Sequence, residues 1–223
     1  MHYYTNNVNA RSDEKDFGYT LRGYNFKFTT DIGVFSKKDV DFGSRLLVES
    51  YTAPDVDGNI LDVGCGYGPI GLSLAKSYVN RNIHMVDVNQ RALELSRKNA
   101  QDNKISNVTI YESFCYEGVT GEFASILSNP PIRAGKKVVH AIIEEAKEYL
   151  VENGELWIVI QKKQGAPSAK AKMEEVYGTC EVVANWRSLR SDMITWIDFD
   201  SGRSFTVNNF FTASLFVGSQ AIP

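Results

Sequence analysis

The sequence predicts an α/β fold in which a mostly parallel central sheet is covered by helices on both faces. From Asn59 onward, short apolar strands alternate with amphipathic helices, and this alternation implies right-handed crossovers between parallel strands. The run Leu156–Ile160 is continuously apolar, as expected for a strand that is buried on both faces. A glycine-rich turn at residues 64–68 joins the first of these strands to the helix that follows it.

The composition fits one sizeable core with appendages. Of the 223 residues, 43% are hydrophobic and 23% are charged, which is ordinary for a soluble globular protein. There is no run of about 18 apolar residues and no apolar core at the N-terminus, so we expect neither a membrane span nor a secretory signal. Three widely spaced cysteines do not form a disulfide framework, and the histidines are isolated, so we expect a cytoplasmic protein without a metal site. A net charge of -3 is not typical of a strong non-specific nucleic-acid binder, but it is compatible with a local basic patch.

Residues 1–39 are predicted to form a polar tail followed by a β-hairpin. Large and polar residues alternate over Phe17–Thr29, and Arg22-Gly23-Tyr24 interrupts the alternation as a turn would. Asp39 is then expected to cap a helix that runs through Ser50, in which apolar residues recur at helical spacing.

Residues 40–184 are predicted to form one catalytic α/β domain. The last 39 residues, 185–223, are expected to pack on this domain or to complete it, and their stretches 195–199 and 210–217 fit either strands or a cover for an exposed face. The expected strands are 59–63, 82–87, 108–112, 123–128, 155–161 and 179–184, and the expected helices are 69–79, 89–103, 137–150 and 166–177.

The turn Gly64-Cys65-Gly66-Tyr67-Gly68 has the features of a ligand-binding loop. Glycine tolerates positive φ and lets a ligand lie against the backbone, and the helix that starts near Pro69 points its N-terminal amides at the same place. The spacing Gly66-x-Gly68-x-x-Gly71 also fits a dinucleotide fingerprint, and a tight turn without a ligand is the simplest alternative.

Two carboxylates bear on the identity of the ligand. Asp87, with Val88 after it, ends the next strand, where an acid can accept both hydroxyls of a ribose or cap the following helix. Asp62 precedes the first glycine by two residues, where it can pair with the ammonium of a methionine moiety and would repel a pyrophosphate. Asp87 suits either cofactor because each offers a ribose, and Asp62 therefore favours S-adenosylmethionine over a nicotinamide dinucleotide.

Ser128-Asn129-Pro130-Pro131 follows a later strand, at the sheet edge where ligands bind in α/β folds. The two prolines fix the local backbone. The side-chain carbonyl of Asn129 and the main-chain carbonyl of Pro130 can then each accept one proton of an amino group, so that its nitrogen lone pair is aimed at an electrophile. The alternative is an ordinary loop at the end of a strand.

Residues Asp62–Gly68 closely resemble the first motif of class I S-adenosylmethionine-dependent methyltransferases. The resemblance implies a Rossmann-like fold, a loop that wraps the methionine end of the cofactor, and ribose binding at Asp87. Asn129-Pro130-Pro131 is similar to the Asn/Asp-Pro-Pro-aromatic motif of methyltransferases acting on planar amino groups, except that Ile132 replaces the aromatic residue. The cofactor-binding residues implied are Asp62, Gly64, Cys65, Gly66, Gly68, Asp87, Val88, Phe114 and Asn129, and the catalytic residues are Asn129, Pro130 and Pro131.

A narrower resemblance covers roughly residues 17–184. Gly33-Val34-Phe35-Ser36, residues 41–47 and residues 128–140 resemble the ribosomal-RNA guanine-N2 methyltransferases of the small-subunit methyltransferase C type. This implies methylation of an exocyclic amino group, guanine N2 of ribosomal RNA, by a monomer or homodimer that binds RNA or a ribosomal particle. The implied substrate contacts are Phe35, Ile132, Arg133 and Lys136.

Two features depart from the family pattern. Phe114 stands where many relatives carry an acid that receives the adenine amino group, and the final antiparallel strand of the sheet is not recognisable after Ala184. Alternative functions are methylation of a protein glutamine or a small-molecule amine, and a non-catalytic cofactor-binding module associated with RNA.

Overall fold

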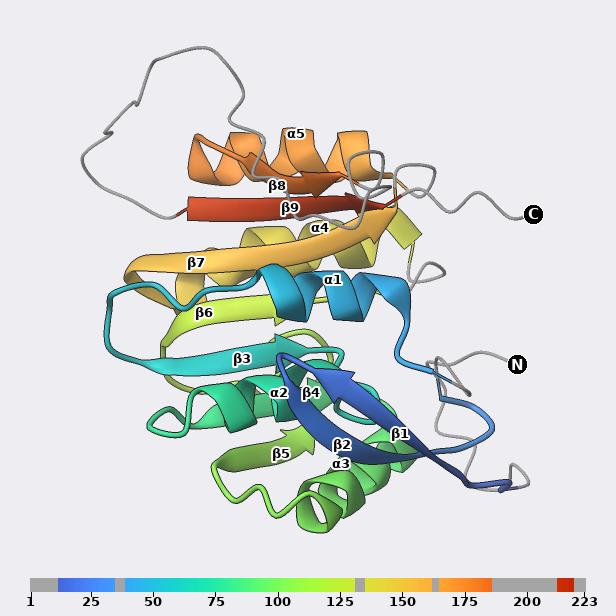
Figure 1. Ribbon diagram of the computed structural model, residues 1–223. Coiled ribbons are helices and arrows are strands. Elements are labelled where there is room, and N and C mark those ends of the chain that lie inside the picture. Colours follow the sequence, from blue (N-terminus) through green and yellow to red (C-terminus); the bar gives the residue numbers. More distant parts are fainter. Residues whose placement is uncertain (1–11, 35–38, 131–134, 162–164, 186–211, 219–223) are drawn as a thin grey trace.

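The computed structural model describes residues 12–34, 39–130, 135–161, 165–185 and 212–218. Seven strands form one sheet in the order β5-β4-β3-β6-β7-β9-β8, and every pairing in it is parallel (Figure 1). The predicted α/β fold with a parallel sheet is thus confirmed. The strands of the sheet are β3 Asn59–Val63, β4 Ile83–Asp87, β5 Val108–Glu112, β6 Phe123–Ser128, β7 Leu150–Gln161, β8 Glu181–Asn185 and β9 Thr212–Gly218. The helices are α1 Phe42–Ser50, α2 Pro69–Ser77, α3 Gln90–Asp102, α4 Gly135–Glu145 and α5 Ala166–Tyr177, with a 3-10 turn at Ala146–Tyr149.

Two apolar clusters bury the two faces of the sheet. On one face, buried residues of α1, α2 and α3 pack with strand residues such as Ile60 and Trp157. On the other face, buried residues of α4 and α5 pack with Leu61 and Ile158. Neighbouring residues of a strand serve opposite clusters because strand side chains alternate between faces. Helices therefore cover both faces, as predicted.

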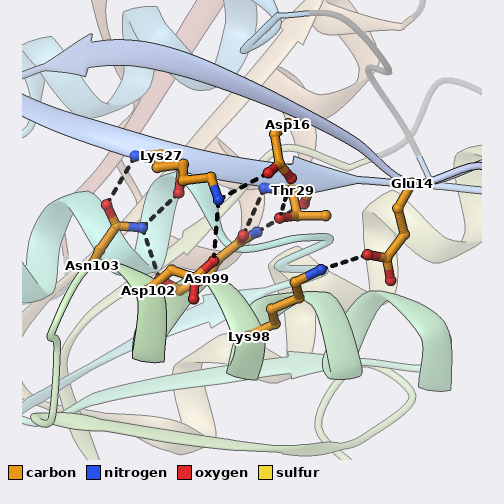
Figure 2. A network of polar contacts seen from close by, with 8 residues as sticks. All are labelled: Glu14, Asp16, Lys27, Thr29, Lys98, Asn99, Asp102 and Asn103. Carbon is orange, nitrogen blue, oxygen red and sulfur yellow. Dashed lines mark hydrogen bonds and ion pairs between the residues drawn. The ribbon is translucent and has the colours of Figure 1, made fainter.

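The predicted N-terminal hairpin is also present. Strands β1 Lys15–Leu21 and β2 Tyr24–Thr30 pair antiparallel, and Arg22 and Gly23 form the turn with φ of 50° and 78°. Positive φ at both central residues is the geometry whose twist suits a two-residue hairpin. The hairpin lies against α3 and is joined to it by the polar contacts in Figure 2.

Three predicted element boundaries were wrong. The cap of α1 is Asp41 rather than Asp39, because the Asp41 side chain accepts a hydrogen bond from Ser44 N at 3.1 Å. The predicted helix 137–150 ends at Glu145, and β7 begins at Leu150 rather than at residue 155. Gly154 permits this early start: a Cβ there would lie 2.9 Å from Val151 O, so only glycine fits the tight backbone at this point.

The C-terminal extension contributes a strand to the same sheet. β9 lies between β7 and β8 and is parallel to both, instead of forming the antiparallel ending that the family resemblance implies. Residues 195–199, the other stretch considered as a strand, lie outside the described residues. Within the part of the chain that the structure describes, no helix is both long and apolar enough to cross a membrane.

Candidate functional site

A cavity of about 370 Å³ opens at the carboxyl ends of β3, β4, β5 and β6. The chain runs outward from β3 to β4 and β5 and then returns to β6 on the other side of β3, so the cavity lies at the topological switch point of the sheet. The lining residues are Gly33, Val34, Asp41, Ser44, Val63, Gly64, Cys65, Gly66, Tyr67, Pro69, Ile70, Asp87, Val88, Asn89, Ala92, Ser113, Phe114, Cys115, Ser128, Asn129, Val138 and Ile142.

The glycines of the loop after β3 have two different tasks. Gly64 and Gly66 line the cavity with φ of 77° and 58°, and a Cβ on either would meet no atom within 4 Å. Their backbone therefore faces open space that a ligand can occupy. Gly68, in contrast, lies outside the lining, and its Cβ would come within 2.9 Å of Leu72 and Met85, so it serves the packing of α2.

The Asp87 carboxylate lines the cavity at the end of β4. Its Oδ2 accepts from Gly66 N at 3.0 Å and its Oδ1 from Asn89 N at 2.9 Å, so it fixes the glycine loop and the start of α3 together. Burial raises the pKa of Asp87, and hydrogen bonds from the backbone amides of Asn89, Gly66 and Val88 oppose that rise. The two carboxylate oxygens together offer about four acceptor sites, so one remains for a further donor after these three amides.

Asp62 lies beneath the loop and is fully buried. Its Oδ2 accepts from Gly71 N in α2 at 2.9 Å, and its Oδ1 has no hydrogen-bond partner among the described residues. Burial raises the pKa of Asp62 to about 7, and the neighbouring Asp87 acts in the same direction. Asp62 does not line the cavity, so the proposed effect on a bound ammonium would act through the loop as a buried negative charge.

Asn129 lines the opposite side of the cavity, directly after β6. Its Nδ2 donates to Asp41 Oδ1 at 3.0 Å and to Ser44 Oγ at 2.9 Å, so both amide protons have partners on α1 and its cap. Pro130 is buried next to it. Asp41 and Ser44 were absent from the predicted site because the cap of the helix was placed at Asp39, and a correct cap would have pointed to them.

The segment that reaches the cavity from the hairpin is clamped to α3. Arg91 Nη1 lies 3.5 Å from Asp31 Oδ2 and donates to Ile32 O at 2.9 Å. Asn89 Nδ2 donates to Gly33 O at 3.3 Å. These contacts hold Gly33 and Val34 at the cavity wall.

The remaining predicted site residues fall into three groups. Cys65, Val88 and Phe114 line the cavity. The Phe114 side chain is 47% exposed, which is unusual for a large aromatic residue and leaves ring surface available for stacking. Lys136 is exposed in the first turn of α4 and is not part of the lining. Phe35, Pro131, Ile132 and Arg133 lie outside the described residues.

The cavity fits the cofactor implied by the sequence. S-adenosylmethionine combines an adenosine with a positively charged methionine end, so its site needs an open backbone cradle, an acid near the ribose and negative charge near the cation. Gly64 and Gly66 provide the open cradle, the Asp87 carboxylate lines the wall, and Asp62 has an unpartnered buried oxygen under the loop. These residues remain proposed ligands.

Comparison with known proteins identifies the family. A family model described as methyltransferase small domain matches residues 25–189. The uncharacterized protein YbxB of Bacillus subtilis (strain 168) is 59% identical over 184 residues, which cover 82% of this chain and 92% of that protein. Ribosomal RNA small subunit methyltransferase C of Aeromonas hydrophila is 40% identical over 131 residues, which cover 57% of this chain and 37% of that protein.

A solved structure shares the fold. The T. thermophilus 16S rRNA N2 methyltransferase RsmC, solved in complex with AdoMet and guanosine, matches with a TM-score of 0.67 at 24% identity. The match covers 74% of this chain and 46% of that one, so the present chain spans less than half the length of either of these two RNA methyltransferases. The chain therefore belongs to the methyltransferase small domain family, as a class I S-adenosylmethionine-dependent methyltransferase of the group that includes ribosomal RNA small subunit methyltransferase C.

Proposed function

We propose that this methyltransferase acts on an exocyclic amino group, and that its acceptor is guanine N2 of ribosomal RNA. The observation that carries the proposal is the position of Asn129. It lies in the same cavity as the glycine loop and Asp87, and both protons of its amide are already bonded to Asp41 and Ser44. Its carbonyl oxygen is therefore the group left to accept a proton from an incoming amino group.

The acceptor chemistry requires orientation rather than a strong base. When bound, S-adenosylmethionine supplies a methyl group on a sulfonium, which becomes a neutral thioether as the methyl carbon bonds to the acceptor nitrogen. Asn129 Oδ1 and the carbonyl oxygen of Pro130 would each accept a hydrogen bond from one N–H of the amino group. These two bonds would turn the nitrogen lone pair out of conjugation with the ring. The nitrogen becomes cationic as the N–C bond forms and then loses its extra proton to water, so positioning and electrostatics supply the catalysis.

The comparisons support a nucleic-acid acceptor. The Aeromonas relative is named as a small-subunit ribosomal RNA methyltransferase, and the T. thermophilus structure is a complex with AdoMet and guanosine. A base within a duplex would have to be flipped out or already unpaired to reach a cavity of this kind. The exposed ring of Phe114 belongs to the cofactor side of the cavity, so we keep Phe35 and Ile132, with Arg133 and Lys136, as proposed contacts to the RNA.

The test supplies the protein with labelled S-adenosylmethionine and, in separate reactions, deproteinised ribosomal RNA, assembled ribosomal subunits and total cell protein. We expect label in ribosomal RNA, as N2-methylguanine after digestion. Label confined to protein would contradict the proposal and favour a glutamine acceptor. Absence of S-adenosylmethionine binding in calorimetry would instead favour a non-catalytic module.

Asn129→Ala tests whether the site acts in methyl transfer separately from whether it still binds the cofactor. Removing the acceptor should lower transfer by at least about 100-fold, as loss of one preorganised hydrogen-bonding group does in other enzymes. Cofactor affinity should stay near that of the wild type, because the glycine loop and Asp87 are untouched. If transfer survives at the wild-type rate, the proposed role of Asn129 is wrong.

A further inference from the structure

We propose that Asp41 is a positioning residue that fixes the orientation of the Asn129 amide and thereby makes asparagine, rather than aspartate, the functional residue at position 129. This inference rests on the function proposed above. Asp41 lies 88 residues before Asn129 in the chain, on a helix cap outside the sheet, and contacts it in the wall of the cavity.

The chemistry of Asp41 determines which end of the amide faces it. An ionised carboxylate only accepts hydrogen bonds, so the atom of Asn129 that lies 3.0 Å from Asp41 Oδ1 has to be the amide nitrogen. Ser44 Oγ takes the second amide proton at 2.9 Å. The carbonyl oxygen then points away from α1. Without Asp41, the amide could turn over and present its NH2 group to the substrate amino group, which would place two donors against each other.

Asp41 is itself held in place by α1. The same Oδ1 that accepts from Asn129 also accepts from Ser44 N at 3.1 Å, which is the capping bond of the helix. The orientation of Asn129 is therefore tied to a rigid helix start. A side chain held by such a second contact keeps a reacting group within the small tolerance that catalysis requires.

Gly43, which lies beside the contact between the two side chains, leaves room for it. A Cβ on Gly43 would lie 3.1 Å from Asp41 Oδ1 and 3.4 Å from Asn129 Nδ2. The φ angle of Gly43 is not in the left-handed region, so glycine is not needed there for the backbone. The absence of a side chain on Gly43 instead allows Asn129 and Asp41 to approach each other. This is a second observation that supports a specific contact between them.

The arrangement also explains why aspartate would fail at position 129. A carboxylate there would lie about 3 Å from that of Asp41, and like charges at this distance cannot both ionise. The new carboxylate in an Asn129→Asp variant would share a proton with Asp41, and the site would work only when that proton is present. Asp41, the cap of α1, thus favours asparagine over aspartate at position 129.

The test is a double-mutant cycle that exchanges the two side chains. Asn129→Asp should lower kcat by roughly 100-fold at pH 8, whereas Asp41→Asn should lower it by less than about fivefold, because asparagine also caps helices and its carbonyl also accepts from Nδ2. The double variant exchanges donor and acceptor, and it gives up the capping bond from Ser44 N because an NH2 group then takes the place of Asp41 Oδ1. It should recover at least about tenfold over Asn129→Asp, which a purely structural role for Asp41 would not produce.

The pH profile provides the second readout. Relative to the wild type, the activity of Asn129→Asp should rise as the pH falls from 8 to 5.5. The proton shared by the two carboxyl groups then lets the side chain at position 129 donate to Asp41, as the amide does in the wild type. The double variant should lose this acid rescue. Additive losses without recovery, or an activity ratio that does not change with pH, would overturn the proposal.

Controls separate this inference from the proposed function and from folding. Asn89→Asp makes the same change at another asparagine of the cavity lining, and Asp41→Asn should not restore its activity. Melting temperature and S-adenosylmethionine affinity, measured for the single variants at positions 41 and 129, should stay close to wild type, whereas the double variant should melt lower because it loses the cap of α1. Failure of Asn129→Ala to reduce transfer would contradict the role of Asn129, whereas a normal loss there without recovery in the double variant would contradict only the role of Asp41.

Discussion

The two sides of the cavity are built differently. The glycine loop is supported from behind by buried apolar contacts with the hairpin and by a hydrogen bond from Asn99 of α3, whereas Asn129 is held by two polar groups, the Asp41 carboxylate and the Ser44 hydroxyl. The support of Asn129 comes from a segment that precedes the first strand of the sheet, whereas the loop is supported both by the hairpin before that strand and by α3 after it. The proposed cofactor side, formed by the glycine loop, therefore depends on packing and full burial. The proposed acceptor side, formed by Asn129, depends on the charge and direction of a few hydrogen bonds.

Tyr67 is the centre of the cofactor side. Its ring contacts Phe28 and Phe17 of the hairpin, with centroids 5.6 and 6.1 Å away, and its carbonyl accepts from Asn99 Nδ2 at 2.8 Å. Asn99 is fully buried in α3 and also exchanges two hydrogen bonds with the backbone of Thr29. This side chain therefore joins hairpin, helix and glycine loop at one point.

The largest effect is expected from Asn99→Ala. It leaves the N–H and C=O of Thr29 and the C=O of Tyr67 buried without these bonds, which should lower the free energy of unfolding by about 2–4 kcal/mol. Because the loop loses an anchor, S-adenosylmethionine affinity should fall by roughly tenfold, which corresponds to about 1.4 kcal/mol. Denaturant unfolding and calorimetry measure the two quantities.

Asn103→Ala is the matched control for Asn99. One turn later along the chain, Asn103 makes the same pair of bonds to the backbone of Lys27 but does not contact Tyr67 (Figure 2). Its site is more exposed, so we expect a loss near 1 kcal/mol and unchanged cofactor affinity. Equal losses of cofactor affinity in both variants would mean that the hairpin as a whole, and not the bond to Tyr67, supports the loop.

The next effect concerns the charge under the glycine loop. The pKa of Asp62 in the folded, cofactor-free protein is about 7, above its ordinary value of 3.8, so between these values the folded state binds more protons than the unfolded state. The free energy of unfolding should therefore fall as the pH rises from 5 to 7, by up to about 1.4 kcal/mol per pH unit from this group. Asp62→Asn should remove this contribution, and a wild-type slope in that variant would show that other groups cause it.

A smaller effect is expected from Gly43→Ala on the acceptor side. Its Cβ would press on Asp41 and Asn129, so kcat should drop by roughly tenfold. Stability should hold or rise, because alanine favours helices over glycine by about 1 kcal/mol. An unchanged kcat would show that the pair tolerates displacement and would weaken the contrast between the two sides.

The smallest effect should come from the rim of the hairpin contact. Lys98 and Glu14 form an ion pair in Figure 2 with side chains that remain 44% and 47% exposed. Lys98→Ala should change the free energy of unfolding by less than about 0.5 kcal/mol, and this small change should shrink further at high salt. A loss above about 1 kcal/mol would mean that surface charge, and not Asn99, holds the hairpin in place.

Much of this molecule follows from local sequence. The alternation of apolar strands with amphipathic helices fixed the α/β architecture, because each element has to bury one face against its neighbours. The glycines of residues 64–68 and the carboxylates of Asp62 and Asp87 pointed to an adenosine cofactor, and Asn129 to an amino acceptor. These inferences depend on residues close together in the chain, where spacing alone implies geometry.

The errors and omissions concern contacts between distant segments. The position of β9 between β7 and β8 depends on its pairing with two strands that come earlier in the chain, and no local pattern encodes that pairing. Gly154 follows the expected helix 137–150, a place where glycine commonly ends a helix, whereas here it serves a close backbone approach within β7.

By itself, the sequence determined the kind of fold and the family of the enzyme and pointed to the proposed cofactor loop, since these rest on periodicity and on motifs of a few residues. Only the tertiary structure decided how the two sides of the cavity are supported. Asn99 reaches Tyr67 and Thr29 across 32 and 70 residues, and Asp41 reaches Asn129 across 88. Hydrogen bonds between groups so far apart in the chain exist only once the packed sheet and its helices have brought those groups within about 3 Å of each other.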